Sequence, residues 1–264
     1  MNFITLFMNR INKLTIEYVL SEWESDVFFT ALAANTSLTH LSIYSPKKSE
    51  GLRSVLMSNT TLTSLTYHSR NLDPSDVLIG LTYNTNIQRL EISDVDEQSV
   101  NHLVKLLNTN TKITSLRLTC VNFTDHIIPR SLIDALSSNT VLETLLIQGI
   151  KRNEYEPNTV NLILTGLSRN KHSSLNELII DVGSQTVNAD VLIQVIRLPL
   201  SKLFIDGHLL DLQPHHYEII ELNETLTRIS IECGDNCLKE VARRNKDNLR
   251  LKRVTLESLL LSVV

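Results

Sequence analysis

The chain has 264 residues, of which 42% are hydrophobic and 5% aromatic, and its net charge is −4. Glycine and proline number only 7 and 6, which argues against a sandwich or barrel rich in tight turns. The charge gives no reason to expect nucleic-acid binding, and three cysteines are too few for a disulfide framework. A reducing compartment is therefore the simpler expectation.

Residues 1–10 are expected to form an N-terminal cap. Their apolar run, FITLFM, is too short for the core of a signal peptide and far too short to span a membrane. Its large side chains would instead fold over Ile11 and Leu14, which begin the next segment.

From residue 11 to residue 233 the sequence motif L-x-x-L-x-I recurs. Its three apolar positions, which we call the anchors, also accept similar apolar residues. Most copies begin 24 to 29 residues apart, and one unit is stretched to 33 residues. A period of this length indicates a solenoid, so we predict one array and not two domains. The nine copies begin at Ile11, Leu38, Leu62, Ile87, Ile113, Leu142, Leu175, Leu200 and Leu226.

Each copy follows an apolar stretch with helical spacing, such as Val27, Phe28, Ala31 and Leu32 in the first full unit. Each unit is therefore predicted to contain a short strand, a loop, a helix and a turn that leads to the next strand. Residues that favour helix N-termini precede several of these stretches. They are Asp73-Pro74, Asp94 to Asp96, Thr124-Asp125, Asn158-Thr159 and Asn188 to Asp190.

An asparagine, usually followed by threonine, ends the helical half of most units. Asparagine enters the left-handed backbone region more easily than most residues, so we expect it to close each helix in that conformation. The dipeptide is interpreted as part of a turn and not as part of a chemical site. The positions are Asn35, Asn59, Asn84, Asn110, Asn139 and Asn170.

The unit N-T-x-L-x-x-L-x-I resembles the leucine-rich repeat of the ribonuclease-inhibitor-like subclass. The longer motif A-L-x-x-N-T-x-L-x-x-L-x-I is similar to the repeats of leucine-rich-repeat proteins of intracellular bacteria, including Legionella effectors. The resemblance implies an α/β right-handed horseshoe of about nine repeats, with parallel strands on the concave face and helices on the convex face. It also implies a virulence protein, secreted by a bacterium into the host cytoplasm, that binds a host protein. Without it, the expectation is a cytoplasmic chain.

The concave face should be formed by the residues between the second and third anchors, because alternate strand side chains point to opposite faces. Successive units place Leu146, Ile179 and Phe204 there, after a polar series that ends in Arg117. A clustered apolar patch on a surface indicates a binding site. The alternative is that a loop, or the tail of residues 254–264, covers it.

Polar and acidic residues should border this patch. Such a rim favours a partner protein segment with basic residues and one or two apolar anchors. The alternative is a charged surface that only contacts solvent. The rim comprises Gln148, Asp181, Asp206 and Glu232 in the next column of strand positions, with Glu177 beside it. We expect the protein itself to be a monomer.

Residues 234–253 are expected to form a C-terminal capping helix, followed by an apolar tail at 254–264. Seven basic and two acidic residues lie between Leu238 and Arg253. A membrane-surface adaptor that uses residues 238–264 is therefore an alternative to a plain cap. The tail would be a short helix docked on the last repeat, a C-terminal ligand for a groove, or a secretion signal.

No catalytic motif is evident, so we expect no enzyme activity, cofactor or metal site. His215, His216 and Glu218, placed in a loop before a helix, lack a further ligand at metal-binding spacing. Cys233 and Asp235 match the Cys-x-Asp of certain bacterial leucine-rich-repeat ubiquitin ligases. Those ligases carry a large helical catalytic domain, whereas only about thirty residues follow here. A ligase-type enzyme that uses Cys233 is kept as an alternative.

Overall fold

The computed structural model describes residues 11–17, 22–44, 50–69, 73–119, 130–149, 159–210, 216, 219, 223, 225–233 and 253–255. The predicted N-terminal cap, residues 1–10, lies outside the described residues, as do residues 234–252 of the predicted C-terminal helix.

One parallel sheet runs through the described part of the chain, and its strand order is the chain order from β1 to β10. The prediction of an α/β fold with parallel strands is therefore confirmed. The strands are β1 (Lys13–Ile16), β2 (His40–Tyr44), β3 (Ser64–His68), β4 (Arg89–Ser93), β5 (Ser115–Thr119), β6 (Thr144–Gln148), β7 (Glu177–Asn188), β8 (Lys202–Leu210), β9 (Arg228–Cys233) and β10 (Arg253–Thr255).

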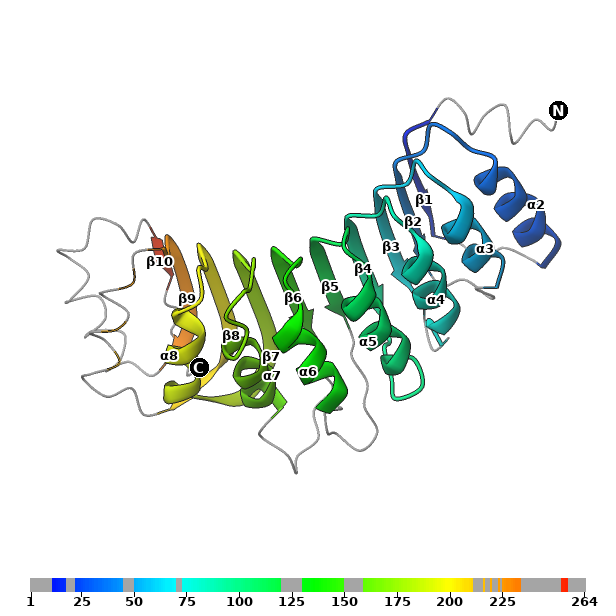
Figure 1. Cartoon of the computed structure of the whole chain (residues 1–264). Helices are drawn as coiled ribbons and strands as arrows, with labels where there is room; N and C mark the ends of the chain where they lie inside the picture. The colour runs from blue at the N-terminus through cyan, green and yellow to red at the C-terminus, as the bar shows by residue number, and fades with distance from the viewer. Residues whose placement is uncertain are drawn as a thin grey trace, which may run out of the picture.

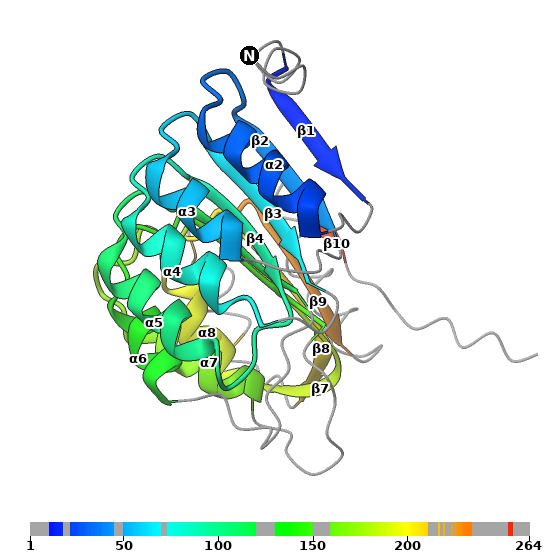
Figure 2. The same cartoon turned by 90° about the vertical axis from the view of Figure 1, so that its right-hand side faces the viewer.

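The helices form a second layer on one face of the sheet, and the units stack side by side in a curved row (Figure 1). Figure 2 shows the two layers from the N-terminal end. No described helix lies over the other sheet face, which we call the bare face. None of the helices in the described ranges is long and apolar enough to cross a membrane. They are α2 (Glu22–Ala33), α3 (Glu50–Ser58), α4 (Ser75–Tyr83), α5 (Val100–Thr109), α6 (Arg130–Ser138), α7 (Thr159–Ser168) and α8 (Ala189–Ile196).

The core lies between the two layers and is built from the recurring anchors. In β3 the anchors Leu65 and Tyr67 are fully buried, and Leu62 just before the strand is buried with them. Helix residues such as Leu52 and Leu56 close the same core from the other side. Each buried aliphatic side chain contributes about 1.5 to 3 kcal/mol before chain entropy is subtracted, so neighbouring units are needed to complete one another.

Buried asparagines connect successive units at the turns between helix and strand. Oδ1 of Asn84 accepts the backbone N–H groups of Asn86 at 2.9 Å and Ile87 at 2.8 Å. Its Nδ2 donates to two carbonyls of the preceding unit, Leu56 at 2.7 Å and Asn59 at 3.2 Å. Because the amide is only 4% exposed, these four bonds replace the water it has lost. We call the series of such bonds, made also by Asn59, Asn110, Asn139, Asn170 and Asn223, the asparagine ladder.

The prediction that these asparagines adopt the left-handed conformation is wrong. Asn84 (φ −77°, ψ 131°) and Asn110 (φ −82°, ψ 124°) are extended. Among the described residues, Asp94 is the only non-glycine residue with a positive φ. The side-chain amide binds the N–H groups that follow it, so the backbone can leave the helix in an extended form and lead directly into the strand.

Several predicted helix starts are confirmed. Oδ1 of Asn188 accepts the N–H groups of Asp190 at 2.8 Å and Val191 at 3.3 Å and so caps α8. Before α5, Oδ1 of Asp96 accepts the N–H of Ser99 at 2.9 Å. The proposed start at residues 124–125 lies outside the described residues.

The C-terminal strands are less regular than the others. The pairing of β7 with β8 shifts in register after Asp181, and the pairing of β8 with β9 shifts after Ile205. Strand β10 pairs in parallel with β9. Arg253 was expected to end the C-terminal capping helix. Val254 and Thr255 were expected to begin the apolar tail, and a short docked helix was one interpretation of that tail. These three residues instead extend the sheet, because their backbone groups complete the free edge of β9.

Candidate functional site

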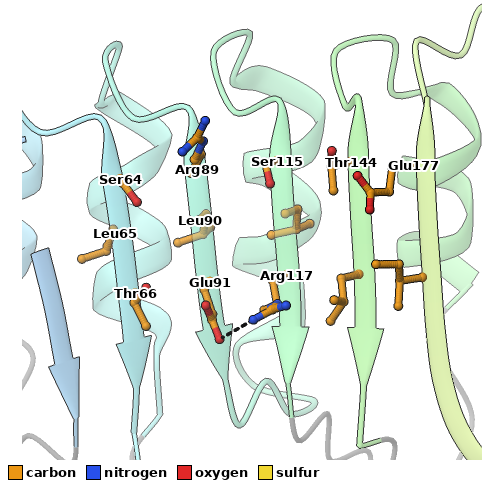
Figure 3. Close-up of a pocket in the computed structure, with 13 residues that line it drawn as sticks. Ser64, Leu65, Thr66, Arg89, Leu90, Glu91, Ser115, Arg117, Thr144 and Glu177 are labelled. Atoms are coloured by element: carbon orange, nitrogen blue, oxygen red, sulfur yellow. Dashed lines mark ion pairs between the residues drawn. The ribbon is translucent and has the colours of Figure 1, made fainter. Parts of the chain in front are cut away.

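The bare face carries a hollow of about 270 Å³ that crosses strands β3 to β7 (Figure 3). Two alternate positions of each strand supply most of its lining. Residues two apart on a strand point to the same face, and neighbouring strands are in register, so these positions form two columns. The first column is Ser64, Arg89, Ser115, Thr144 and Glu177, and the second column is Thr66, Glu91, Arg117, Leu146 and Ile179.

Glu91 lies between His68 and Arg117 on the N-terminal side of the hollow. Its Oε1 lies 3.2 Å from Nε2 of His68 and 3.5 Å from a guanidinium nitrogen of Arg117. The ring of His68 stacks on Tyr44, with centroids 5.0 Å apart and planes 6° apart. Because these side chains are partly exposed, each ion pair contributes only about 0 to 1 kcal/mol, and an incoming charged group can replace either partner.

Glu177 closes the opposite side of the first column and is also paired. Its Oε2 lies 3.1 Å from Nζ of Lys202 on the neighbouring strand β8. Both carboxylates that line the hollow are therefore balanced by cations.

Arg89 differs from the other charged residues of the hollow. Its side chain is exposed, and within the described residues it forms no ion pair. The first column also carries Lys13 and His40, on β1 and β2. The pKa of His40 lies below its ordinary value, mainly because of burial and further because of the positive charges of Lys13 and Arg89. Lys13 and Arg89 are the basic side chains that act on His40 in this part of the face.

The predicted apolar patch is present in part. Leu146, Ile179 and Phe204 lie in register on β6, β7 and β8. Phe204 is 37% exposed and Ile179 is half-buried, but Leu146 is only 7% exposed, so the expectation of three exposed residues is wrong at Leu146. The side chains of Arg117 and Ile179 flank Leu146 on both neighbouring strands, which reduces its contact with solvent.

The predicted polar rim is described only at some of its positions. Gln148 is exposed and Asp181 half-buried, and the two are in register on β6 and β7. Asp206 pairs with Asp181 along the backbone, but the register shift places Glu232 opposite His208, so the expected column breaks there. The side chains of Asp206 and Glu232 lie outside the described residues.

The sequence interpretation placed Glu177 beside the rim but missed Arg89, Ser115 and Thr144 of the same column. Ser64, Arg89, Ser115 and Thr144 stand just before the second anchor of their units, two residues ahead of the second column. Residues two apart on a strand point to the same face. An alignment of the repeats would therefore have placed these residues on the bare face, beside the second column.

The remaining candidate residues form no second site in the described part of the chain. His216 is helical and not in a loop as expected, and its Nε2 lies 2.9 Å from Oδ1 of Asp190, which links this segment to α8. No group of three potential metal ligands is found among the described residues. Cys233 ends β9, but its side chain lies outside the described residues, as do His215 and Glu218.

No family model and no curated protein matches the sequence. Among solved structures, the chain is similar to one described as "Leiomodin-1 Actin-Binding Site 2 (ABS2)", at 16% sequence identity and a TM-score of 0.34. The match covers 63% of this chain and 84% of the other. A similarity at this level supports no argument about function, so the candidate site rests on the geometry of the bare face.

Proposed function

We propose that the chain is a leucine-rich-repeat protein of the ribonuclease-inhibitor-like subclass. Two features support this family. The recurring L-x-x-L-x-I units coincide with successive parallel strands, each preceded by a helix in most units. The asparagine ladder joins consecutive units through bonds that span 24 to 34 residues.

We further propose that the protein is a non-enzymatic interaction module that binds another protein through the bare face. The observation that carries this proposal is the hollow across β3 to β7, which continues in register to the exposed ring of Phe204. An apolar side chain next to paired and unpaired charges is typical of a protein-binding surface. Following the resemblance, we propose a monomeric bacterial effector that is secreted into the host cytoplasm and binds a host protein.

The experiment uses the full chain as bait in a lysate of host cells, followed by identification of the captured protein and titration of the purified pair. The test variant is Ile179→Ser with Phe204→Glu, which places a polar and a charged group on the patch. The matched control is Met57→Glu with Leu162→Glu, because these side chains on α3 and α7 are 47% and 39% exposed, similar to Phe204.

We expect the test variant to lose binding at least tenfold, which is about 1.4 kcal/mol, while the control variant keeps it. Both proteins are compared by circular dichroism and thermal unfolding to establish that they fold. Equal binding by a folded test variant would place the partner elsewhere and refute the proposed role of the bare face.

A further inference from the structure

We propose that the hollow receives an extended segment of the partner protein, with a carboxylate side chain over Arg89 and an apolar side chain over Ile179 and Phe204. This inference rests on the proposed protein-binding role of the same face and names the chemistry of the segment that binds there.

The balance of charge in the hollow favours an acidic group. Its lining contains two arginines, Arg89 and Arg117, and two glutamates, Glu91 and Glu177. Glu91 is paired with Arg117 and His68, and Glu177 with Lys202. Arg89 therefore remains as the cation of the hollow without an ion pair among the described residues. An incoming carboxylate would pair with Arg89 without displacing another group.

Hydroxyl groups stand on both sides of Arg89. Ser64 on β3 and Ser115 on β5 pair with Arg89 along the backbone, and Figure 3 shows the three side chains in one row across the strands. Hydroxyls donate hydrogen bonds to a carboxylate, and a guanidinium binds both of its oxygens through two parallel N–H groups. The row Ser64, Arg89 and Ser115 thus offers donors from three strands to one anion.

The apolar end of the hollow sets the length of the segment. Ile179 lies three strands from Arg89 and two residues further along the strand direction, in the second column. Strand spacing of ~4.8 Å and a rise of ~3.3 Å per residue put the two ends roughly 16 Å apart. An extended chain covers that distance in about five residues. The expected motif in the partner therefore combines an aspartate or glutamate with a large apolar residue. The two residues are separated by that number of positions, in either order.

The sequence-based expectation of a basic segment concerned mainly a different edge of the face. It rested on Gln148, Asp181, Asp206 and Glu232, which follow the second column along the strands, and on Glu177, whose charge is balanced by Lys202. Arg89 begins β4 and so lies at the opposite edge. A partner that contacts both edges would present its acidic residue to the hollow and any basic residue to the rim.

The test is selection of linear peptides from a random display library on the full chain. Five proteins are compared: the wild type, Arg89→Glu, Arg89→Gln, Lys105→Glu, and Ile179→Ser with Phe204→Glu. Lys105 is the matched control because it is exposed on α5, in the helical layer on the other side of the sheet. An Arg89→Gln variant, which removes the charge without reversing it, shows whether loss of binding follows charge or misfolding.

We expect the wild type to enrich peptides in which an acidic residue lies about five positions from an apolar one. Arg89→Glu should bind these peptides about tenfold more weakly or worse, Arg89→Gln should have an intermediate effect, and Lys105→Glu should stay within about twofold. Selection on Arg89→Glu should favour a basic residue at the former acidic position.

Two negative results have different meanings. Peptides that require Ile179 and Phe204, yet lack an acidic residue or bind Arg89→Glu as well as the wild type, would overturn this inference and leave the binding role of the face intact. Enriched peptides that bind the Ile179→Ser, Phe204→Glu protein with full affinity would overturn the proposed function together with the inference.

Discussion

The turns that end the helices and the bare face of the strands belong to the same repeating units, yet they are built in opposite ways. At the turns, asparagine returns with the same hydrogen bonds in unit after unit, and at Asn35, Asn59, Asn84 and Asn110 it is 3% to 7% exposed. On the bare face, the second column changes from Thr66 to Glu91, Arg117, Leu146 and Ile179 within five strands.

The difference separates positions that hold the array together from positions that are free to recognise something else. A residue whose bonds cross from one unit to the next must recur, because each gap would leave buried carbonyl and N–H groups without partners. An exposed residue of the bare face, such as Phe204, can change without leaving buried groups unpartnered. The predictions below test this separation.

The largest loss of stability is expected from the ladder. Asn84→Ala removes four hydrogen bonds and leaves the carbonyls of Leu56 and Asn59 and two N–H groups without their partner. We expect the free energy of unfolding to fall by about 3 kcal/mol, measured by chemical denaturation. Thr85→Ala, at the exposed neighbouring position, is the control and should change it by less than about 0.5 kcal/mol. Similar losses in both variants would contradict the importance of the ladder.

Two residues of the second column should differ from each other in stability. Leu146→Ala removes a side chain that is 7% exposed and should cost about 2 to 3 kcal/mol, whereas Phe204 is 37% exposed. Phe204→Ala should therefore cost about 1 kcal/mol or less. Thermal unfolding of the two variants side by side checks this order, and a larger loss at Phe204 would mean that its ring supports the fold and is not available to a partner.

The ion pairs of the bare face should contribute little to stability. The side chains of Lys202 and Glu177 are 43% and 26% exposed, so solvent screens their attraction. We expect Lys202→Met to change the free energy of unfolding by less than about 1 kcal/mol, as measured by urea titration at low and high salt. A loss well above that value would show that charges on this face belong to the structural framework.

The smallest effect is a dependence on pH through His40. Its pKa is lowered below 6.5 by burial and by Lys13 and Arg89, so the unfolded chain takes up a proton at a higher pH than the folded chain does. The contribution of His40 to stability is thus fully present above pH 6.5 and is lost as the pH falls through the folded-state pKa. His40→Gln should make the decline of unfolding free energy between about pH 7.5 and pH 5 less steep. An unchanged slope would contradict the lowered pKa of His40.

The recurring part of the molecule could be predicted from the sequence because recurrence itself is the evidence. The strand anchors, the helix starts at Asp96 and Asn188, and the parallel order of the sheet followed from the repeat. The conformation of the asparagines could not be predicted, because a left-handed turn and a side-chain cap place the same residue at the same position. Only the partners of Asn84 in the preceding unit distinguish the two.

The candidate site could be predicted only in outline, because exposure depends on neighbours across the sheet. The alternation of side chains placed Leu146 on the bare face, but its burial depends on the residues that stand beside it on β5 and β7. The importance of Arg89 depends on which carboxylates already have cations, a question of distances between strands that the sequence does not contain.

The most direct test asks whether recurring positions hold the structure and non-recurring positions bind the partner. It measures stability and binding together for Asn84→Ala and Phe204→Glu, with the captured partner or a selected peptide as the ligand. We predict that Asn84→Ala lowers the free energy of unfolding by about 3 kcal/mol but binds normally at temperatures where it is folded. Phe204→Glu should unfold like the wild type and bind at least tenfold more weakly, a loss of about 1.4 kcal/mol. If binding falls in Asn84→Ala, or persists in Phe204→Glu, recurring and non-recurring positions do not divide structure from recognition in this protein.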